Sequence, residues 1–260
     1  MATSAQLSSA GEAMFLPDRQ QSTVSVDIST IFSAGILTRC DHRDSWVDQL
    51  TPVEKAQIGD VCEKRYAEFA AGRSQARQLI AALTGVAETL PVGEYRQPLW
   101  PQSVIGSISH SDDYCAVAVS RRSVVTGLGV DVEPYEDLDA DVADIVLTDS
   151  ELAATRTRDA MASTMGNTLV DEALIDKTLV GGKAHKLIFS IKEAIYKCCY
   201  PQVRAFIDFK QCEVTLDPQT RSYKGVIDCC NADDQPVHLE VTGKWMIEAG
   251  HIFASAEFRR

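Results

Sequence analysis

The chain has 260 residues, of which 45% are hydrophobic and 24% are charged. This composition is that of an ordinary globular protein and excludes collagen-like, coiled-coil and wholly disordered chains. With 25 basic and 37 acidic residues, the formal net charge is −12, which argues against a general nucleic-acid binder, because such proteins need a basic surface to neutralise phosphates.

The N-terminus and the cysteines bear on the compartment. The first residues lack the basic and apolar segments of a secretory signal, and we expect residues 1–20 to form a flexible tail. No apolar run approaches the roughly 18 residues of a spanning helix, so we expect no stable membrane insertion. The eight cysteines contain no C-x-x-C pair and offer no zinc-site spacing. We therefore expect a cytoplasmic protein with free, mostly buried thiols.

The clearest helical stretch runs from residue 51 to residue 84. It begins with Thr51-Pro52-Val53-Glu54, a capping box with proline at the first helical position. Apolar residues then recur at helical spacing between residues 76 and 83. Gly72 is a candidate interruption, and Gly85 is placed to end the helix.

Strand patterns follow. Residues 114–119 and 124–133 are short and β-branched, with a polar turn at 120–123. Residues 131–151 hold nine acidic residues and no basic one, and Thr148-Asp-Ser-Glu151 is a candidate helix cap. Residues 154–182 show no clear pattern, whereas the end of the chain predicts a β-meander with strands at 212–217, 223–228, 237–248 and 251–258. Helices mixed with hairpin-linked strands indicate an α+β fold with antiparallel sheets, divided near 122–124.

Asp131 and Glu133 are two residues apart in a predicted strand. Side chains at this spacing point to the same face, so both carboxylates would face one site while Val130 and Val132 face the core. Two close carboxylates repel each other unless a cation or a proton relieves them, and Mg²⁺ suits that role. The alternative is a pair of solvated acids on the polar face of a strand.

Residues 189–197 predict the start of a helix of roughly three turns. Lys192, Glu193 and Lys197 would then lie near its first turn, where free backbone N–H groups favour anions. A structural interpretation competes, because Ser190-x-x-Glu193 matches a capping box and Glu193 and Lys197 form a favourable i,i+4 pair.

Two further clusters are candidates for binding phosphate. The run Gly106-Ser-Ile-Ser-His110-Ser lies at a predicted strand end and offers hydroxyls and an imidazole, although a turn histidine or a Ser–His hydrolase would also fit. No G-x-S-x-G elbow supports the hydrolase. Arg73 and Arg77 share one helix face, either as solvated surface or as a clamp for a phosphomonoester.

The order and content of these motifs resemble the 4′-phosphopantetheinyl transferases, and most closely the larger single-chain branch of the enterobactin synthetase component D type. The resemblance covers about residues 60–200, and its last two motifs are the specific ones. The motifs are Ala71-Gly-Arg73-x-x-Ala76-Arg77, Pro98-x-Trp100-Pro101, Gly106-Ser-Ile-Ser-His110-Ser, Gly129-Val-Asp131-Val-Glu133 and Phe189-Ser-x-Lys192-Glu193-Ala-x-Tyr-Lys197.

The resemblance implies two similar α+β halves related by a pseudo-twofold axis, each with an antiparallel sheet and a long helix, and an active site in the cleft between them. The N-terminal half would span 21–123, and the C-terminal half, 124–260, would carry the metal site. The family transfers the 4′-phosphopantetheine arm of coenzyme A to a serine of an acyl, aryl or peptidyl carrier protein and releases adenosine 3′,5′-bisphosphate. A monomer acting in nonribosomal peptide or siderophore biosynthesis is implied, with fatty-acid or polyketide carriers as alternatives.

The resemblance also implies roles for single residues. Asp131, Glu133 and Glu193 would hold Mg²⁺, and Glu193 would be the base for the acceptor serine, directly or through water. Lys192 and Lys197 would contact the phosphates, with Lys197 stabilising the leaving group. The remaining positions would bind the nucleotide end of coenzyme A. The 3′-phosphate would be bound by His110, Arg73, Arg65 and Ser109. The adenine side would be bound by Arg96, Gln97 and Pro98.

Residues 183–210 carry six cations against two acids in a strongly acidic chain. This basic stretch could hold the phosphates, and we hypothesise that Lys183 and Lys186 also dock an acidic carrier protein. Two other functions fit the same motifs. One is a coenzyme A-binding protein without transfer activity, and the other is a Mg²⁺-dependent pyrophosphate hydrolase without a protein acceptor.

Overall fold

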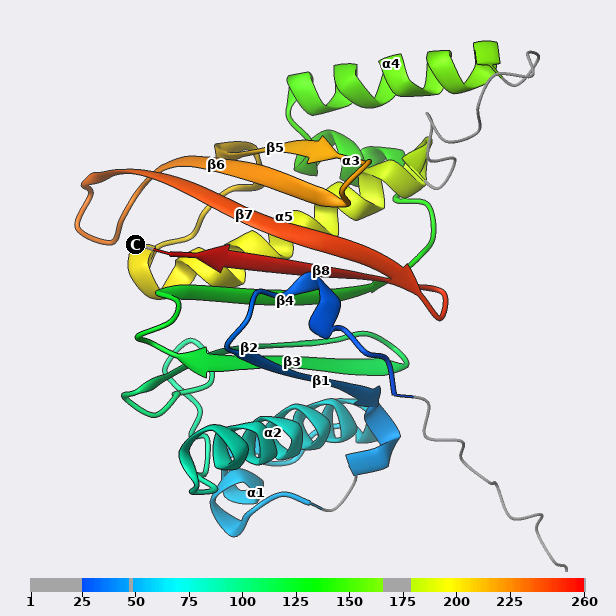
Figure 1. Ribbon diagram of the computed structural model, residues 1–260. Coiled ribbons are helices and arrows are strands. Elements are labelled where there is room, and N and C mark those ends of the chain that lie inside the picture. Colours follow the sequence, from blue (N-terminus) through cyan, green and yellow to red (C-terminus); the bar gives the residue numbers. More distant parts are fainter. Residues whose placement is uncertain (1–24, 47–48, 166–178, 260) are drawn as a thin grey trace, which may run out of the picture.

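The computed structural model describes residues 25–46, 49–165 and 179–259. It confirms the predicted α+β fold, because it contains two antiparallel sheets, each packed against one long helix (Figure 1). The predicted tail at 1–20 lies outside the described residues. So do residues 166–178, which fall in the stretch without a clear pattern.

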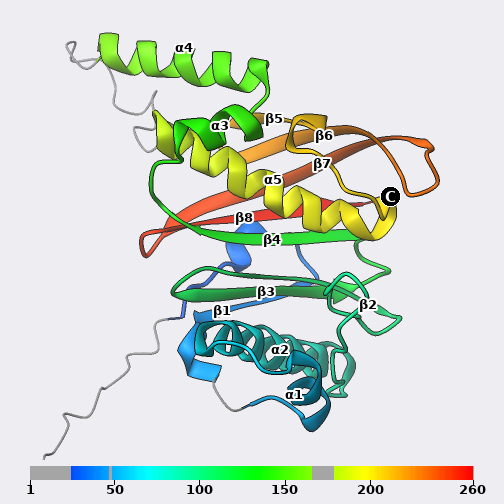
Figure 2. The same cartoon turned by 180° about the vertical axis from the view of Figure 1, so that it is seen from behind.

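The N-terminal half is built on a three-stranded sheet with the strand order β1-β3-β2. The helix α2 covers one face of this sheet, and α1 lies beside α2 (Figures 1 and 2). The elements of this half are η1 (Ser29–Ile31), β1 (Ile36–His42), η2 (Arg43–Trp46), α1 (Pro52–Ile58), α2 (Glu63–Thr84), β2 (Val104–His110) and β3 (Tyr114–Arg121).

The C-terminal half is built on a five-stranded sheet with the order β4-β8-β7-β6-β5, and α5 crosses one face of it (Figure 2). The predicted meander is confirmed, with strand ends that differ by at most two residues. The elements are β4 (Gly127–Pro134), α3 (Ala140–Val146), α4 (Asp149–Met165), α5 (Gly182–Val203), η5 (Phe209–Gln211), β5 (Cys212–Asp217), β6 (Ser222–Cys230), β7 (Pro236–Glu248) and β8 (His251–Phe258).

The predicted helix at 51–84 is two helices, and the interruption lies at Gly59 rather than at Gly72. Both hydrogen bonds of the Thr51–Glu54 capping box are present, and Gly85 ends α2 in the left-handed conformation, as predicted. Gly59 ends α1 with φ of 68°. Gly72 lies inside α2, where a Cβ would come within 2.8 Å of the Ile108 side chain. It therefore allows α2 to pack closely on the sheet.

The strands β3 and β4 follow each other in the chain but belong to different sheets. β3 pairs with β1 and β2, whereas β4 pairs with β8. The two sheets meet where β2 runs beside β4, because the hydroxyls of Ser107 and Ser109 accept the backbone N–H groups of Val130 and Val132 at 3.0 and 3.4 Å. Residues of both halves therefore lie next to each other along this seam.

Successive side chains of β4 point alternately toward the core between the sheets and toward α5. Val130 and Val132 are fully buried in the core between the sheets, as predicted. The alternate positions face α5, which approaches so closely that a Cβ at Gly129 would lie 1.9 Å from the carbonyl oxygen of Ala194. This close approach brings the side chains of α5 directly over Asp131.

α5 is a helix of 22 residues that begins at Gly182, so the predicted helix start near residue 189 was wrong. Ser190 and Glu193 lie in the middle of α5 and do not form a capping box. Within the described ranges, no helix is long and apolar enough to cross a membrane. The eight cysteines all lie in described parts of the chain and are free, six of them buried and Cys62 and Cys230 exposed.

Candidate active site

Asp131 is the centre of a buried polar cluster at the meeting point of β2, β4 and α5. Only 2% of the residue is exposed. Ser109 and Ser190 each donate a hydrogen bond of 2.8 Å to its carboxylate, one from β2 and one from α5. Lys197 forms an ion pair with it at 2.6 Å and donates to the Ser109 hydroxyl at 2.9 Å. The carboxylate is thus fixed by residues of both halves.

Glu133 and Glu193 lie beside this cluster. Lys186 forms an ion pair of 2.6 Å with Glu133, whereas Glu193 makes no side-chain hydrogen bond or ion pair with the residues that the structure describes. Burial raises the pKa of Glu193, and the negative charges of Asp131 and Glu133 raise it further against the opposing effect of Lys197. Burial and Asp131 likewise raise the pKa of Glu133, although Lys186 partly offsets them. The three carboxylates are therefore electrostatic neighbours.

The predicted magnesium ligands Asp131, Glu133 and Glu193 are not gathered around one point in this arrangement. Among the described residues, no group of three His, Cys, Asp or Glu side chains is arranged to hold a metal ion, because the carboxylates of Asp131 and Glu133 are drawn to Lys197 and Lys186. The chemistry of the donor set nevertheless fits the ion, since hard carboxylate oxygens are what Mg²⁺ prefers. A bound cation would also lower the raised pKa of Glu193, which has no ion-pair partner among the described residues.

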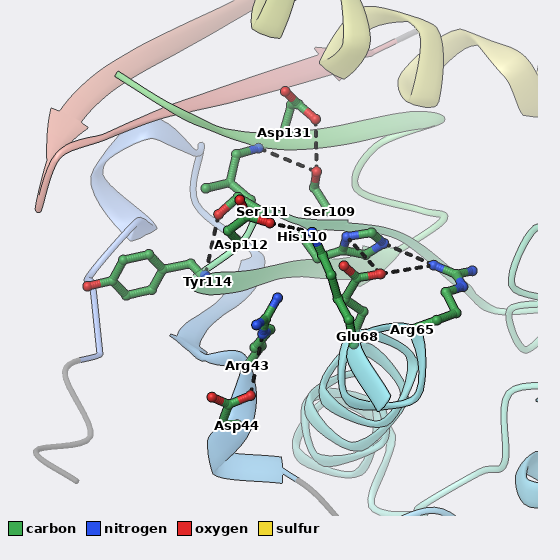
Figure 3. Close-up of polar contacts among 12 residues, drawn as sticks. Arg43, Asp44, Arg65, Glu68, Ser109, His110, Ser111, Asp112, Tyr114 and Asp131 are labelled. Carbon is green, nitrogen blue, oxygen red and sulfur yellow. Dashed lines mark hydrogen bonds and ion pairs between the residues drawn. The ribbon is translucent and has the colours of Figure 1, made fainter. Parts of the chain in front are cut away.

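His110 follows Ser109 at the end of β2 and meets α2. Arg65 donates to His110 Nε2 at 3.2 Å, and the Glu68 carboxylate lies 3.7 Å from His110 Nδ1 and 3.5 Å from Arg65 (Figure 3). Burial lowers the pKa of His110, with Glu68 opposing and Arg65 adding to the shift. His110 and Arg65, both predicted to bind the 3′-phosphate, therefore lie together, and the Glu68 carboxylate is beside them.

Arg73 and Arg77 have different surroundings. Arg73 lies two turns beyond Arg65 on α2, where its guanidinium packs 4.6 Å above the Phe69 ring and burial lowers its pKa to about 10. Its Nε is buried without a hydrogen-bond partner among the described residues. Arg77 is paired with Glu54 and the carbonyl of Gln49. Arg77 is therefore structural and not the phosphate clamp that its spacing allowed.

Two of the predicted phosphate contacts do not fit the structure. Lys192 is 2% exposed, and its ammonium contacts Glu151 at 2.8 Å and the carbonyls of Val146 and Phe209 at 2.9 Å each. All its donors are used on the side of α5 away from Asp131. Ser109 is also buried, and its hydroxyl is engaged by Asp131 and Lys197. Ser109 therefore orients the cluster rather than lining a phosphate pocket.

A groove of about 1090 Å³, here called the central groove, opens beside this cluster. Its walls come from the loop before β2 and from the last turns of α5, so it lies between the two halves. Arg96, Gln97 and Pro98, the predicted adenine-side residues, line it together with Trp100 and Tyr200. Four cations line it and no Asp or Glu of the described residues does; the cations are Arg96, Arg122, Lys197 and Arg204. This lining suits a large anion with a flat ring.

A second cavity, the side pocket, has a volume of about 210 Å³ and lies against α5 next to Glu193. Its walls are mostly apolar and include Ile195, Ile207 and Phe209. Phe206 stands at its edge with 74% of its surface exposed. Tyr196 lines both cavities, so the groove and the pocket are neighbours on α5.

The hypothesis that Lys186 docks a carrier protein is not supported, because this ammonium is buried against Glu133. Lys186, Ser190 and Glu68 also belong to the site, although no local pattern in the sequence predicted them there. Lys186, Ser190, Glu193 and Lys197 recur at spacings of four and three residues and share one face of α5. If the predicted helix had begun at residue 182, these four residues would have been predicted on one face. Glu68 lies three residues after Arg65, which is the spacing of a helix pair.

Comparison with known proteins identifies related chains. The model of the 4′-phosphopantetheinyl transferase N-terminal domain matches residues 53–120, and that of the 4′-phosphopantetheinyl transferase superfamily matches residues 127–250. A 4′-phosphopantetheinyl transferase of Streptomyces mobaraensis is 30% identical over 70% of this chain and 68% of its own length. One of Nocardia iowensis is 27% identical over 80% and 88%. The enterobactin synthase component D of Escherichia coli K12 is 31% identical over 60% and 65%.

Proposed function

The chain belongs to the 4′-phosphopantetheinyl transferase superfamily, and from this membership we propose which of its residues carry out the reaction and on which substrates. The protein is an enzyme that transfers the 4′-phosphopantetheine arm of coenzyme A to a carrier protein. The observation that carries the assignment of residues is the Asp131 cluster, which adjoins a cation-lined groove between the two halves.

Coenzyme A would lie along the face of α5. Its nucleotide would occupy the central groove, where cations and aromatic rings fit an adenine and its phosphates. The pyrophosphate would lie at Lys197, and the 3′-phosphate would be bound by His110 and Arg65. The apolar side pocket beside Glu193 would hold the pantetheine arm.

The metal ligands would be Asp131, Glu133 and Glu193, with Lys186 releasing Glu133 to the ion. When bound, Mg²⁺ supplies neutralisation of the pyrophosphate oxygens. Lys186 and Lys197 now neutralise two of these carboxylates, Glu133 and Asp131.

Phosphoryl transfer depends on positioning and charge stabilisation more than on covalent catalysis. Glu193 would accept the proton of the carrier serine, and its raised pKa brings it closer to the range of a useful base. The serine oxygen then bonds to the phosphorus of the arm, while the bond from that phosphorus to the bridging oxygen breaks. The electron pair leaves with adenosine 3′,5′-bisphosphate, and Lys197 would stabilise its negative charge.

Mass spectrometry tests this function directly. Purified protein, coenzyme A and Mg²⁺ are mixed with an apo carrier protein, and we expect the carrier to gain about 340 Da, the mass of the transferred arm. Cleaved coenzyme A with an unmodified carrier would instead indicate the pyrophosphate hydrolase. Bound but unreacted coenzyme A would indicate the binding protein.

We further propose a carrier of nonribosomal peptide or siderophore synthesis as the partner. Support comes from the name of the enterobactin synthase relatives, of which the chain covers about two thirds. A panel of apo carriers from peptide, polyketide and fatty-acid synthesis, compared by kcat/KM, tests this choice. A fatty-acid carrier as the best substrate would contradict it.

Reversing a charge in the central groove should weaken coenzyme A binding. Arg204 is exposed at the C-terminus of α5 and lines the groove, so Arg204→Glu should raise the Kd of coenzyme A about tenfold and reduce its dependence on salt. Calorimetric titration measures both. The control is Arg156→Glu, an exposed reversal on α4 away from the groove (Figure 1). Equal effects of the two variants would mean that the groove does not bind the nucleotide.

The pH dependence of coenzyme A binding should reflect the protonation of His110. Its lowered pKa leaves the imidazole neutral in the free protein at neutral pH, and a bound phosphate would raise that pKa, so binding takes up a proton. The affinity for coenzyme A should therefore fall as the pH rises, by at most about tenfold per pH unit. We expect 3′-dephospho-coenzyme A and the His110→Asn variant to show a flatter profile in calorimetric titrations. If the pH profiles of all three titrations ran parallel, His110 would not be the residue that binds the 3′-phosphate.

A further inference from the structure

Glu151 is a buried carboxylate that joins α4, β5 and α5, and the reaction described above does not use it. Its side chain is 2% exposed. One oxygen accepts the N–H of Val214 in β5 at 2.7 Å, and the other accepts the N–H of Thr148 and pairs with Lys192, each at 2.8 Å. Together with the Thr148 hydroxyl it forms the predicted capping box of α4.

Lys192 connects Glu151 to the side pocket. Its ammonium also binds the carbonyls of Val146, at the end of α3, and of Phe209 in η5. Phe209 is a wall of the side pocket, and Glu193, the next residue of α5, is at its rim. One ammonium and its partner Glu151 therefore link α5 to the wall formed by residues 206–212.

A similar arrangement occurs in the N-terminal half, where it leads to the loop before β2 and not to the side pocket. Glu54 forms the capping box with Thr51, accepts the N–H of Leu90 at 3.4 Å and pairs with Arg77 of α2. Arg77 also binds the carbonyl of Gln49, two residues before Thr51, just as Lys192 binds the carbonyl two residues before Thr148. The two glutamates thus hold equivalent places in the two halves. Glu151 is linked through Lys192 to Phe209 in the side pocket, whereas Glu54 is linked through Leu90 to the loop before β2, part of which lines the central groove.

We infer that Glu151 is a positioning residue for phosphopantetheinyl transfer, which acts through Lys192 to hold the side pocket at the width that the pantetheine arm requires. This inference rests on the proposed placement of the arm in that pocket. It assigns Lys192 a positioning role in place of a phosphate contact. It also predicts that binding of the arm depends on Glu151, although this carboxylate does not contact coenzyme A. Binding of the nucleotide should not depend on it.

The test compares Glu151→Gln with Glu54→Gln, a matched loss of a buried, capping-box carboxylate in the other half. Calorimetric titration gives the Kd of coenzyme A and of adenosine 3′,5′-bisphosphate, which lacks the arm. In Glu151→Gln we expect the Kd of coenzyme A to rise at least about tenfold and that of the bisphosphate to change by less than about twofold. In Glu54→Gln the ratio of the two constants should stay at its wild-type value, even though both variants melt earlier.

The ratio does not depend on the fraction of folded protein, so a purely structural role of Glu151 would leave it unchanged and overturn the inference. If Glu151→Gln does not fold, the double variant Glu151→Gln/Lys192→Met removes both buried charges together and should show the same change in ratio. A wild-type ratio in the double variant would equally overturn the inference. If the wild-type protein does not modify a carrier in the mass assay, the proposed function itself fails, and this role in transfer with it.

Discussion

Replacing Glu193 by glutamine should abolish transfer without unfolding the protein. The amide cannot take the proton of the carrier serine and contributes no negative charge to a bound cation, so kcat should fall by at least about a thousandfold. The mass assay on the carrier, run as a time course, measures this loss.

The stability of the same variant should not fall. The pKa of Glu193 is raised in the folded protein, first by burial and then by Asp131 and Glu133. Above the ordinary pKa of a glutamate, the ionised side chain therefore opposes folding, and this cost is absent in Glu193→Gln. At neutral pH the variant should unfold at the same urea concentration as the wild type or at a higher one.

Glu213→Gln is a suitable control, because it removes an exposed carboxylate of β5 and should leave both quantities unchanged. Turnover of Glu193→Gln near the wild-type rate would exclude this carboxylate as the base. A loss of turnover together with a large loss of stability would mean that Glu193 acts mainly in folding.

Asp131→Asn should have the opposite effect on stability and also a large effect on turnover. The carboxylate is buried and satisfies Lys197, Ser109 and Ser190 at once. An asparagine keeps the shape but leaves the ammonium of Lys197 without its counter-charge. We expect a loss of about 2 kcal/mol in the free energy of unfolding and a fall in kcat of about a hundredfold or more, since Lys197 loses its position.

Urea titration gives the first quantity, and kcat per coenzyme A-binding site gives the second, so that unfolded molecules are not counted. Ser190→Ala is the graded control, because it removes one hydrogen bond to Asp131 and keeps the ion pair. Its losses should be smaller in both measurements. An Asp131→Asn protein with wild-type stability would show that the cluster does not hold the seam between the sheets together.

The two halves repeat one architecture but contribute differently to the site. In β3 the residues that face α2 are apolar, among them Val117 and Val119. In the C-terminal half, the face of β4 that lies under α5 carries Asp131 and Glu133. The carboxylates therefore come from the C-terminal half, which we propose carries the metal site, whereas Ser109, His110 and Arg65 come from the N-terminal half, and the site exists only where the halves meet.

Local patterns in the sequence were sufficient for much of this protein. The four strands of the meander follow from alternation and turn residues. The capping boxes at Thr51 and Thr148 follow from a threonine and a glutamate three residues apart. The common face of Asp131 and Glu133 follows from the two-residue period of a strand. These features depend on residues that are neighbours in the chain, so the sequence specifies them directly.

Side-chain partners across long distances in the chain were decided only by the tertiary structure. Lys192 and Glu193 are consecutive, yet the packing of α5 directs one ammonium to Glu151 and brings the neighbouring carboxylate to the rim of the pocket. The sequence left Arg77 as either solvated surface or a phosphate clamp and suggested that Lys186 docks a carrier, whereas the fold pairs them with Glu54 and Glu133. A buried charge needs a counter-charge wherever the fold provides one, and local periodicity carries no information about which distant residue that will be.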